Sequence, residues 1–209
     1  FTEPTAAAVS FRLLTSVFVG VLFTRANSVS EEAGVKFRND TSFTEPVPGL
    51  PCLIEIKYLN CIPCMHQNPC TKFRLWRHGQ TDWNVVNRFQ GHSDIELNNV
   101  GIYQAQLAAP IIAGMEPTAI LSSDLSRARV TASKLGEIVN MEVLVDERLR
   151  ETNGGHWEGK TGAENRAADL ENFVRWIDGN DNPAGTIGES RSQVAARASA
   201  AIDEFLGDK

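Results

Sequence analysis

The sequence of 209 residues predicts an α/β protein. Three short apolar runs, at residues 73–76, 119–121 and 141–145, have the length and composition of buried strands. Between them lie stretches whose apolar residues recur at helical spacing. Strands that alternate with helices are typical of α/β folds, in which ligands bind at the carboxyl ends of the strands. The turns that follow these runs are therefore the places where a site is expected.

The first apolar run ends in Arg77-His78-Gly79, a basic residue and an imidazole in a turn that glycine permits. An unprotonated imidazole is a good nucleophile near neutral pH, and an adjacent guanidinium can hold an anion. The pair is therefore suited to a phosphoryl group. A histidine that only caps the strand end and bonds to backbone is the alternative at this point.

Polar, glycine-containing sequence follows this turn, up to about residue 94. It holds amide and guanidinium donors suited to an anion. Asn98 is expected to cap the next helix, and Pro110 inside the helical pattern is expected to bend or split that helix.

The second run, 119–121, leads into a clear helical pattern, for which Ser123 or Asp124 is the expected N-cap. Arg127 then lies in the first helical turn, where free N–H groups and the helix dipole favour an anion. A surface arginine is the ordinary interpretation of such a residue. Its position on a strand-to-helix turn favours the site instead.

After the third run, Glu151 begins a glycine-rich loop, where a carboxylate is well placed for acid–base chemistry. A carboxylate that caps a helix or forms a salt bridge is the alternative. Capping-box patterns beginning at Thr161 and Ser190 predict two further helices, with a short flanking helix at 173–177 between them.

Composition changes near residue 70. All four cysteines and six of the nine prolines precede it, and all four tryptophans follow it. We therefore expect an N-terminal extension, residues 1–70, that is poorly ordered, and a folded domain at 71–209. The net charge of −6 and the lack of a basic stripe argue against a nucleic-acid partner.

Within the extension, the apolar run 13–23 is short of the about 20 residues that span a bilayer. With Arg12 before it and small residues after it, the run has the outline of a signal peptide, although Arg25 counts against this. A buried helix or strand is the alternative. A cytoplasmic protein without a membrane partner is therefore expected, and an exported one if 12–28 is a signal segment.

A second motif of the extension, Cys61-x-x-Cys64 with His66 and Cys70, contains residue types that bind zinc. The four residues lie within ten positions, and no distant pair closes the site, so a metal is not expected. A disulfide is the alternative if the chain is exported.

Taken in order, the motifs of residues 71–209 resemble those of the histidine phosphatase superfamily, also called the phosphoglycerate mutase-like family. The matching motifs are Arg77-His78-Gly79-Gln80-Thr81 with Asn84, Arg88-Phe89-Gln90-Gly91, Leu97-Asn98 with Gly101, Ser122-Ser123-Asp124-Leu125-Ser126-Arg127-Ala128, Leu149-Arg150-Glu151, Trp157-Glu158-Gly159 and Gly188-Glu189-Ser190. The resemblance implies a three-layer α/β/α fold with a mostly parallel sheet. It also implies a phosphohistidine mechanism that needs no metal or other cofactor.

The resemblance further implies a role for each site residue. His78 is the expected nucleophile, and Glu151 is the proton donor to the leaving oxygen and then the base for water. Arg77 and Arg127, with Asn84 and Arg129, are the expected clamp on the phosphate oxygens. The other residues expected to bind the small phosphorylated substrate are Gly79, Gln80, Thr81, Gln90, Gly91, Thr152 and Asn153. A homodimer is compatible with the resemblance.

One feature of the family is missing. The family carries a second catalytic histidine in a turn after one more strand, whereas His92 and His156 lie in loops of a different context. We therefore expect a fragment of a complete enzyme, incomplete at its C-terminus and reduced in rate and stability. The missing strand is expected beside the first one, so its absence predicts an open sheet edge there.

The function that this resemblance favours is hydrolysis of phosphomonoesters of small metabolites. Phosphoglycerate mutase is the alternative within the fold, but residues 149–154, Leu-Arg-Glu-Thr-Asn-Gly, differ from the Asn-Glu-Arg-His-Tyr-Gly-like signature of mutases. A non-catalytic relative that binds a phospholigand is the alternative from another class.

Overall fold

The computed structural model describes residues 19–25, 56–59 and 71–207. Five strands of these residues form one sheet in the order β2-β3-β1-β4-β5. The strands are β1 (Val19–Arg25), β2 (Ile56–Leu59), β3 (Thr71–Trp76), β4 (Ala119–Ser122) and β5 (Val143–Val145). The helices are α1 (Asp82–Val85), α2 (Asn99–Ala113), α3 (Ser126–Val139), α4 (Gly162–Ala168), α5 (Leu170–Ile177) and α6 (Arg191–Gly207), with short 3-10 turns η1 (Glu147–Leu149) and η2 (Gly155–Trp157).

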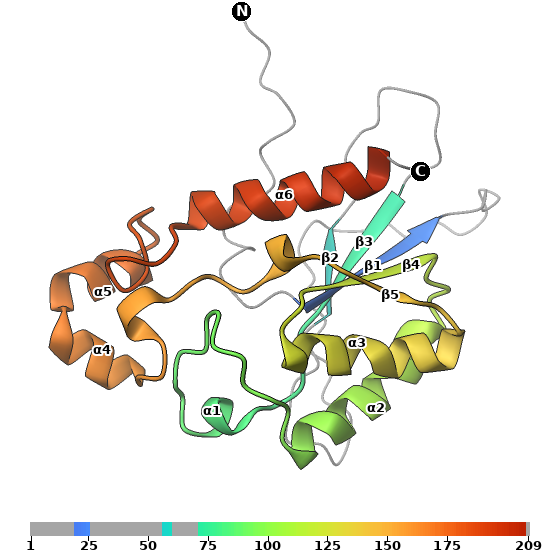
Figure 1. Ribbon diagram of the computed structural model, residues 1–209, viewed down its shortest axis with the longest axis horizontal. Helices are drawn as coiled ribbons and strands as arrows, with labels where there is room; N and C mark the ends of the chain where they lie inside the picture. Colours follow the sequence, from blue (N-terminus) through green and yellow to red (C-terminus); the bar gives the residue numbers. More distant parts are fainter. Residues whose placement is uncertain (1–18, 26–55, 60–70, 208–209) are drawn as a thin grey trace, which may run out of the picture.

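Helices cover both faces of this sheet (Figure 1). Side chains alternate between the two faces along a strand, so neighbouring residues enter different clusters. Trp76 and Ile120 pack with apolar residues of α2 and α3, whereas Leu75 and Leu121 pack with residues of α6. The three-layer α/β/α fold is thereby confirmed.

The strand directions require one correction to the mostly parallel sheet. β4 and β5 pair in parallel, but β1 runs antiparallel to both β3 and β4, and β2 runs antiparallel to β3. The three strands of residues 71–209 therefore point the same way, as predicted. Two of the three antiparallel pairings arise because β1 lies between β3 and β4, and the third joins β2 to β3.

The two antiparallel strands, β1 and β2, come from the N-terminal extension, for which the composition of residues 1–70 predicts poor order. β3 is paired with β2 on one side and β1 on the other, so the open edge expected beside the first strand is not found. The reason is that unpaired backbone groups at this edge accept any extended segment that reaches it. The strand alternative for the run 13–23 agrees with β1 from Val19 onward. Cys52 and the Cys61–Cys70 motif lie outside the described residues, and the division at residue 70 stays a prediction.

The helix signals agree with the structure in most cases. Asn98 caps α2 by accepting from the N–H of Gly101 at 2.9 Å, and Thr161 forms its capping box with Glu164. Pro110 does not split α2, which continues to Ala113; the proline is exposed. In the described part of the chain, none of the helices combines the length and apolar character needed to cross a membrane.

A small aromatic cluster anchors the flank formed by α4 and α5. The Trp157 ring makes edge contacts with Phe89, Phe173 and Trp176, with ring centroids 5.6–6.0 Å apart. Phe89 immediately precedes Gln90, and Trp157 lies in the loop that follows Glu151. The cluster therefore fixes two loops that lead into the site.

Candidate active site

His78 lies two residues beyond the end of β3 and is buried, with 6% of its surface exposed. Its Nδ1 lies 2.6 Å from the carbonyl oxygen of Gly79, so Nδ1 carries the proton and donates it to this carbonyl. Nε2 then holds the lone pair, and no group among the described residues forms a hydrogen bond with it. Burial and the charges of Arg127 and Arg77 lower the pKa of His78 to about 3. The imidazole is therefore neutral near pH 7 and can act as a nucleophile.

The turn after His78 is closely packed. A Cβ atom at Gly79 would lie 2.2 Å from the carbonyl oxygen of Gly101 at the start of α2, which leaves no room for a side chain. The N–H of Gly79 donates to Thr131 Oγ1 at 3.2 Å, and this hydroxyl donates to the Arg127 carbonyl at 2.8 Å. The turn that carries His78 is thus tied to both α2 and α3.

Gly79→Ala is expected to destabilise the protein by about 1–3 kcal/mol, because the new methyl group overlaps backbone atoms that a rotamer change cannot move. Urea denaturation measures the free energy of unfolding. Gly162→Ala is the matched control, since a Cβ there meets only Phe173 at an ordinary 3.7 Å. Equal stability of the two variants would contradict the packing described for Gly79.

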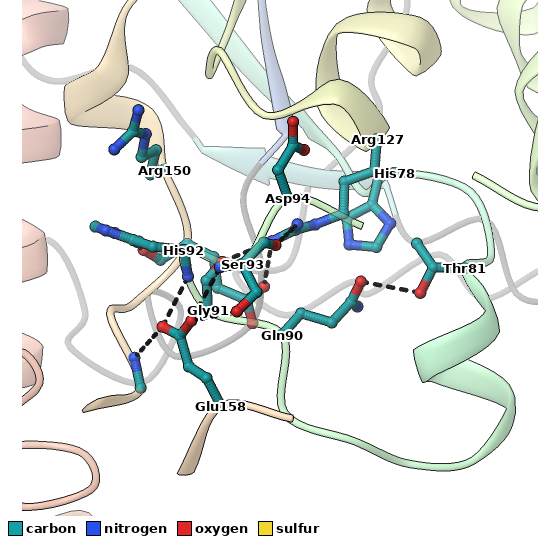
Figure 2. A network of polar contacts seen from close by, with 12 residues as sticks. His78, Thr81, Gln90, Gly91, His92, Ser93, Asp94, Arg127, Arg150 and Glu158 are labelled. Atoms are coloured by element: carbon teal, nitrogen blue, oxygen red, sulfur yellow. Dashed lines mark hydrogen bonds and ion pairs between the residues drawn. The ribbon is translucent and has the colours of Figure 1, made fainter. Parts of the chain in front are cut away.

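Arg127 is fully buried in the first turn of α3, as predicted. It donates from Nη1 to the Ser93 carbonyl at 2.8 Å and from Nη2 to the Gly91 carbonyl at 2.7 Å (Figure 2). Nη2 also donates to Glu151 Oε2 at 3.1 Å. Its Nε has no partner among the described residues. Three of its five N–H groups therefore hold the guanidinium in place, and the Nε–H is among those left for an anion.

The N-cap of α3 corrects a prediction. Neither Ser123 nor Asp124 caps this helix; Asp94, from the loop before α2, accepts from the backbone N–H of Ser126 at 2.7 Å. Asp124 instead pairs with the Arg150 guanidinium. A residue 32 positions upstream thus caps α3, which local sequence patterns do not reveal.

Glu151 lies beside Arg127, with 13% of its side chain exposed. Burial raises the pKa of this carboxyl group to about 7, although the charges of Arg127 and Arg77 act in the opposite direction. A group with this pKa is present in both protonation states near neutral pH. It can therefore donate a proton to a leaving oxygen and afterwards accept one from water.

Glu158 organises the loop next to Arg127 and was not among the predicted site residues. Its carboxylate accepts from the N–H groups of His92, Ser93 and Gly154, each at 2.9 Å, and from the Ser93 hydroxyl at 2.6 Å (Figure 2). These donors lower the pKa of Glu158, although burial opposes them. A carboxylate in the glycine-rich loop after Glu151 was the available signal.

Several predicted residues form hydrogen bonds around the start of α1. The Thr81 hydroxyl contacts Gln90 Oε1 at 2.9 Å and Asn84 Oδ1 at 3.0 Å, and Asn84 also accepts from the Thr81 N–H at 3.0 Å. Asn84 therefore serves as the capping partner of α1 in this structure. The N–H of Gln80 donates to Gln104 at 2.8 Å.

The remaining predicted residues differ in their exposure and in their contacts with the site around His78 and Glu151. Arg77 is exposed, yet its charge lowers the pKa of both His78 and Glu151. Thr152 is buried, and the Asn153 N–H donates to Glu189 at 2.8 Å. Arg129 is exposed on α3, and within the described residues no hydrogen bond links its side chain to the site. Its part in the clamp stays a prediction.

Known proteins are similar to this chain in sequence and in fold. The glucosyl-3-phosphoglycerate phosphatase of Mycobacterium tuberculosis is 45% identical over 136 residues, which cover 65% of this chain and 60% of that protein. A probable phosphoglycerate mutase of Yersinia pestis is 34% identical over 132 residues, covering 63% of this chain and 61% of that protein. The chain thus spans about three fifths of the length of the curated relatives it matches.

Solved structures of related proteins are similar to this chain in fold. The mycobacterial glucosyl-3-phosphoglycerate phosphatase in complex with VO3 has a TM-score of 0.60 at 43% identity, with 63% of this chain and 65% of that chain covered. A Bacillus stearothermophilus protein has a TM-score of 0.57 at 34% identity, over 63% and 65% of the two chains. The sequence model of the histidine phosphatase superfamily, branch 1, matches residues 73–209. The chain therefore belongs to the histidine phosphatase superfamily.

Proposed function

We propose that this protein hydrolyses phosphomonoesters of small metabolites through a phosphohistidine on His78. The observation that carries the proposal is a neutral, buried imidazole whose Nε2 has no partner among the described residues, close to two arginines and to a carboxyl group with a pKa of about 7. These are a nucleophile, an anion clamp and a proton donor within one site.

In the first step, His78 Nε2 attacks phosphorus in line with the ester oxygen, and the bond between phosphorus and that oxygen breaks. Arg127 and Arg77 neutralise the equatorial oxygens, which carry most of the charge in a loose phosphoryl transition state. Protonated Glu151 gives its proton to the leaving oxygen. The Nδ1–H bond to the Gly79 carbonyl keeps the proton on Nδ1 while Nε2 forms the new bond.

In the second step, water attacks the phosphohistidine. Glu151, now ionised, takes a proton from the water, and inorganic phosphate leaves. His78 returns to its neutral form and Glu151 to its protonated form, so the cycle closes without another acid or base.

The relatives support an organic phosphate as the substrate. The mycobacterial relative is a glucosyl-3-phosphoglycerate phosphatase, and solved structures of it hold VO3 or inorganic phosphate. The similarity to a probable phosphoglycerate mutase supports a second candidate, the transfer of phosphate between two hydroxyl groups of one substrate. Supplying 3-phosphoglycerate separates the two, because a mutase yields 2-phosphoglycerate and a phosphatase yields inorganic phosphate.

The decisive test is to trap the intermediate. Rapid acid-free denaturation during turnover of a ³²P-labelled monoester, followed by mass spectrometry, is expected to locate one phosphoryl group on His78. A phosphoryl group on another residue, or none in a turning-over protein, would overturn the proposal. We further propose that the enzyme acts in the cytoplasm, as a monomer or homodimer.

Removal of divalent metals is expected to leave phosphate release unchanged. Arg127 and Arg77 supply the positive charge that metal ions supply in other phosphoryl-transfer enzymes. The measurement is the rate of phosphate release before and after dialysis against EDTA. A loss of rate that Mg²⁺ restores would contradict a mechanism that needs no metal.

A further inference from the structure

We infer that Arg197, on α6, is a positioning residue for the acid Glu151. The inference rests on the proposed function, since it assumes that Glu151 protonates the leaving oxygen. Arg197 was not among the predicted site residues, and no hydrogen bond within the described residues joins its side chain to His78 or Arg127.

The contacts of Arg197 use its whole guanidinium. Nε donates to Glu189 Oε1 at 2.7 Å, and Nη2 donates to Glu189 Oε2 at 2.8 Å and to the Glu151 carbonyl at 2.8 Å. Nη1 donates to the carbonyls of Arg148 at 2.6 Å and Arg150 at 2.7 Å. A guanidinium has five N–H groups, so each of them has an acceptor.

The three carbonyl acceptors lie along one short stretch of backbone that ends at Glu151. Glu189 extends the arrangement beyond Glu151, because it also accepts from the Asn153 N–H at 2.8 Å. His92 Nε2 lies 2.9 Å from the same Glu151 carbonyl that Arg197 contacts. The backbone is therefore fixed before, at and after Glu151.

The two ends of Glu151 are held from different helices. α6 holds its backbone through Arg197, and α3 holds its carboxyl group through Arg127. Glu151 lies outside every helix and strand, so no regular backbone hydrogen bonds fix it. A general acid must lie within hydrogen-bond reach of the leaving oxygen, and a misplacement of about 1 Å can cost about 100-fold in rate. Arg197 therefore acts on the reaction through the position of Glu151.

Lysine cannot take this place. The Arg197–Glu189 pair is largely sheltered, with 18% and 22% of the two side chains exposed, and its contacts are side-on and bidentate. An ammonium group has three donors on one atom and cannot reach a carboxylate and three carbonyls at once.

The test compares Arg197→Met and Arg197→Lys with the unchanged chain on two substrates. Glycerol phosphate has a poor leaving group that needs a proton, whereas p-nitrophenyl phosphate has a good leaving group that does not. The quantity compared is kcat/KM, because it reports only the steps up to loss of the leaving group. For both variants we expect kcat/KM to fall about 30- to 100-fold on glycerol phosphate and about threefold or less on p-nitrophenyl phosphate.

Arg191→Met is the matched control on the same helix. Arg191 stacks on Trp176 at 4.1 Å and donates to the carbonyls of Asn180 and Trp176, so it anchors α6 without reaching Glu151. Its loss is expected to affect both substrates equally. Glu189→Gln keeps the shape of its side chain and is expected to show the same split as Arg197→Met, which covers the case that Arg197→Met does not fold.

The outcomes distinguish a failure of the positioning role of Arg197 from a failure of the proposed function. If the unchanged chain turns over both esters and the folded Arg197 and Glu189 variants lose rate equally on both, the positioning role is wrong and the proposed function stands. If the unchanged chain hydrolyses neither ester, the proposed function is wrong, and the inference is overturned with it.

Discussion

Replacement of His78 by alanine will lower kcat by at least about 10⁴-fold and abolish the phosphorylated intermediate, because a methyl group cannot carry a phosphoryl group. The remaining arginines and Glu151 can still bind a phosphate ester, so KM is expected to change much less than kcat. The rate of phosphate release measures the fall in kcat, and the ³²P label on the protein measures the loss of the phosphorylated intermediate.

His156→Ala is the control for this variant. His156 is exposed in the loop after Glu151, and its backbone N–H donates to the Gly185 carbonyl, a contact that alanine keeps. Its activity is expected to match that of the unchanged protein. Thermal denaturation of both variants shows whether they are folded. A folded His78→Ala protein that still releases phosphate at the original rate would rule out His78 as the nucleophile.

Replacement of Glu151 by glutamine will lower kcat/KM by about 10²- to 10³-fold on an alkyl phosphate and far less on p-nitrophenyl phosphate, because glutamine cannot donate the proton that an alkoxide needs. Glutamine retains the shape of the side chain and can still accept from Arg127. The loss is therefore expected in the chemical step.

The pH dependence of kcat/KM is an independent test of the role of Glu151. Burial raises the pKa of Glu151 to about 7, so the acid is protonated below that pH and lost above it. The basic limb of kcat/KM for an alkyl phosphate should lie near pH 7 and disappear in Glu151→Gln. His78 sets no limb near neutrality, since its pKa of about 3 keeps it neutral throughout. An acidic limb near pH 6 is expected from the substrate phosphate itself.

One control variant accompanies this profile. Glu164→Gln alters an exposed carboxylate of a helix cap and should retain the basic limb. A basic limb that persists unchanged in Glu151→Gln would assign the titration to another group.

The same two pKa values have opposite effects on stability. The lowered pKa of His78 means that the unfolded chain binds the extra proton between about pH 3 and 6.5, so this group makes the fold less stable as pH falls through that window. The raised pKa of Glu151 means that the folded chain binds the extra proton between about pH 4.5 and 7, so this group makes the fold less stable as pH rises there. The site thus retains its neutral imidazole and its protonated acid at a cost in stability.

Local patterns in the sequence predicted the strands β3, β4 and β5 and most of the helices, but not β2. The apolar run before Arg77, the helical spacing after Leu125 and the capping box at Thr161 each depend on neighbours within a few residues, and each agrees with the structure. The position of Arg127 in the first turn of its helix followed from the same local pattern. Resemblance to the family added the roles of His78 and Glu151.

The sequence by itself determined the α/β class, the order of the motifs and the position of Arg127 in the first turn of its helix. Only the tertiary structure decided that β1 separates β3 from β4, that Asp94 caps α3, and that Arg197 holds the backbone at Glu151. It also decided the pKa of about 7 at Glu151, which burial raises against the opposing charge of Arg127, a residue 24 positions away. The physical reason is that caps and strand periods act over one or two turns of chain, whereas these contacts join residues 24 to nearly 100 positions apart.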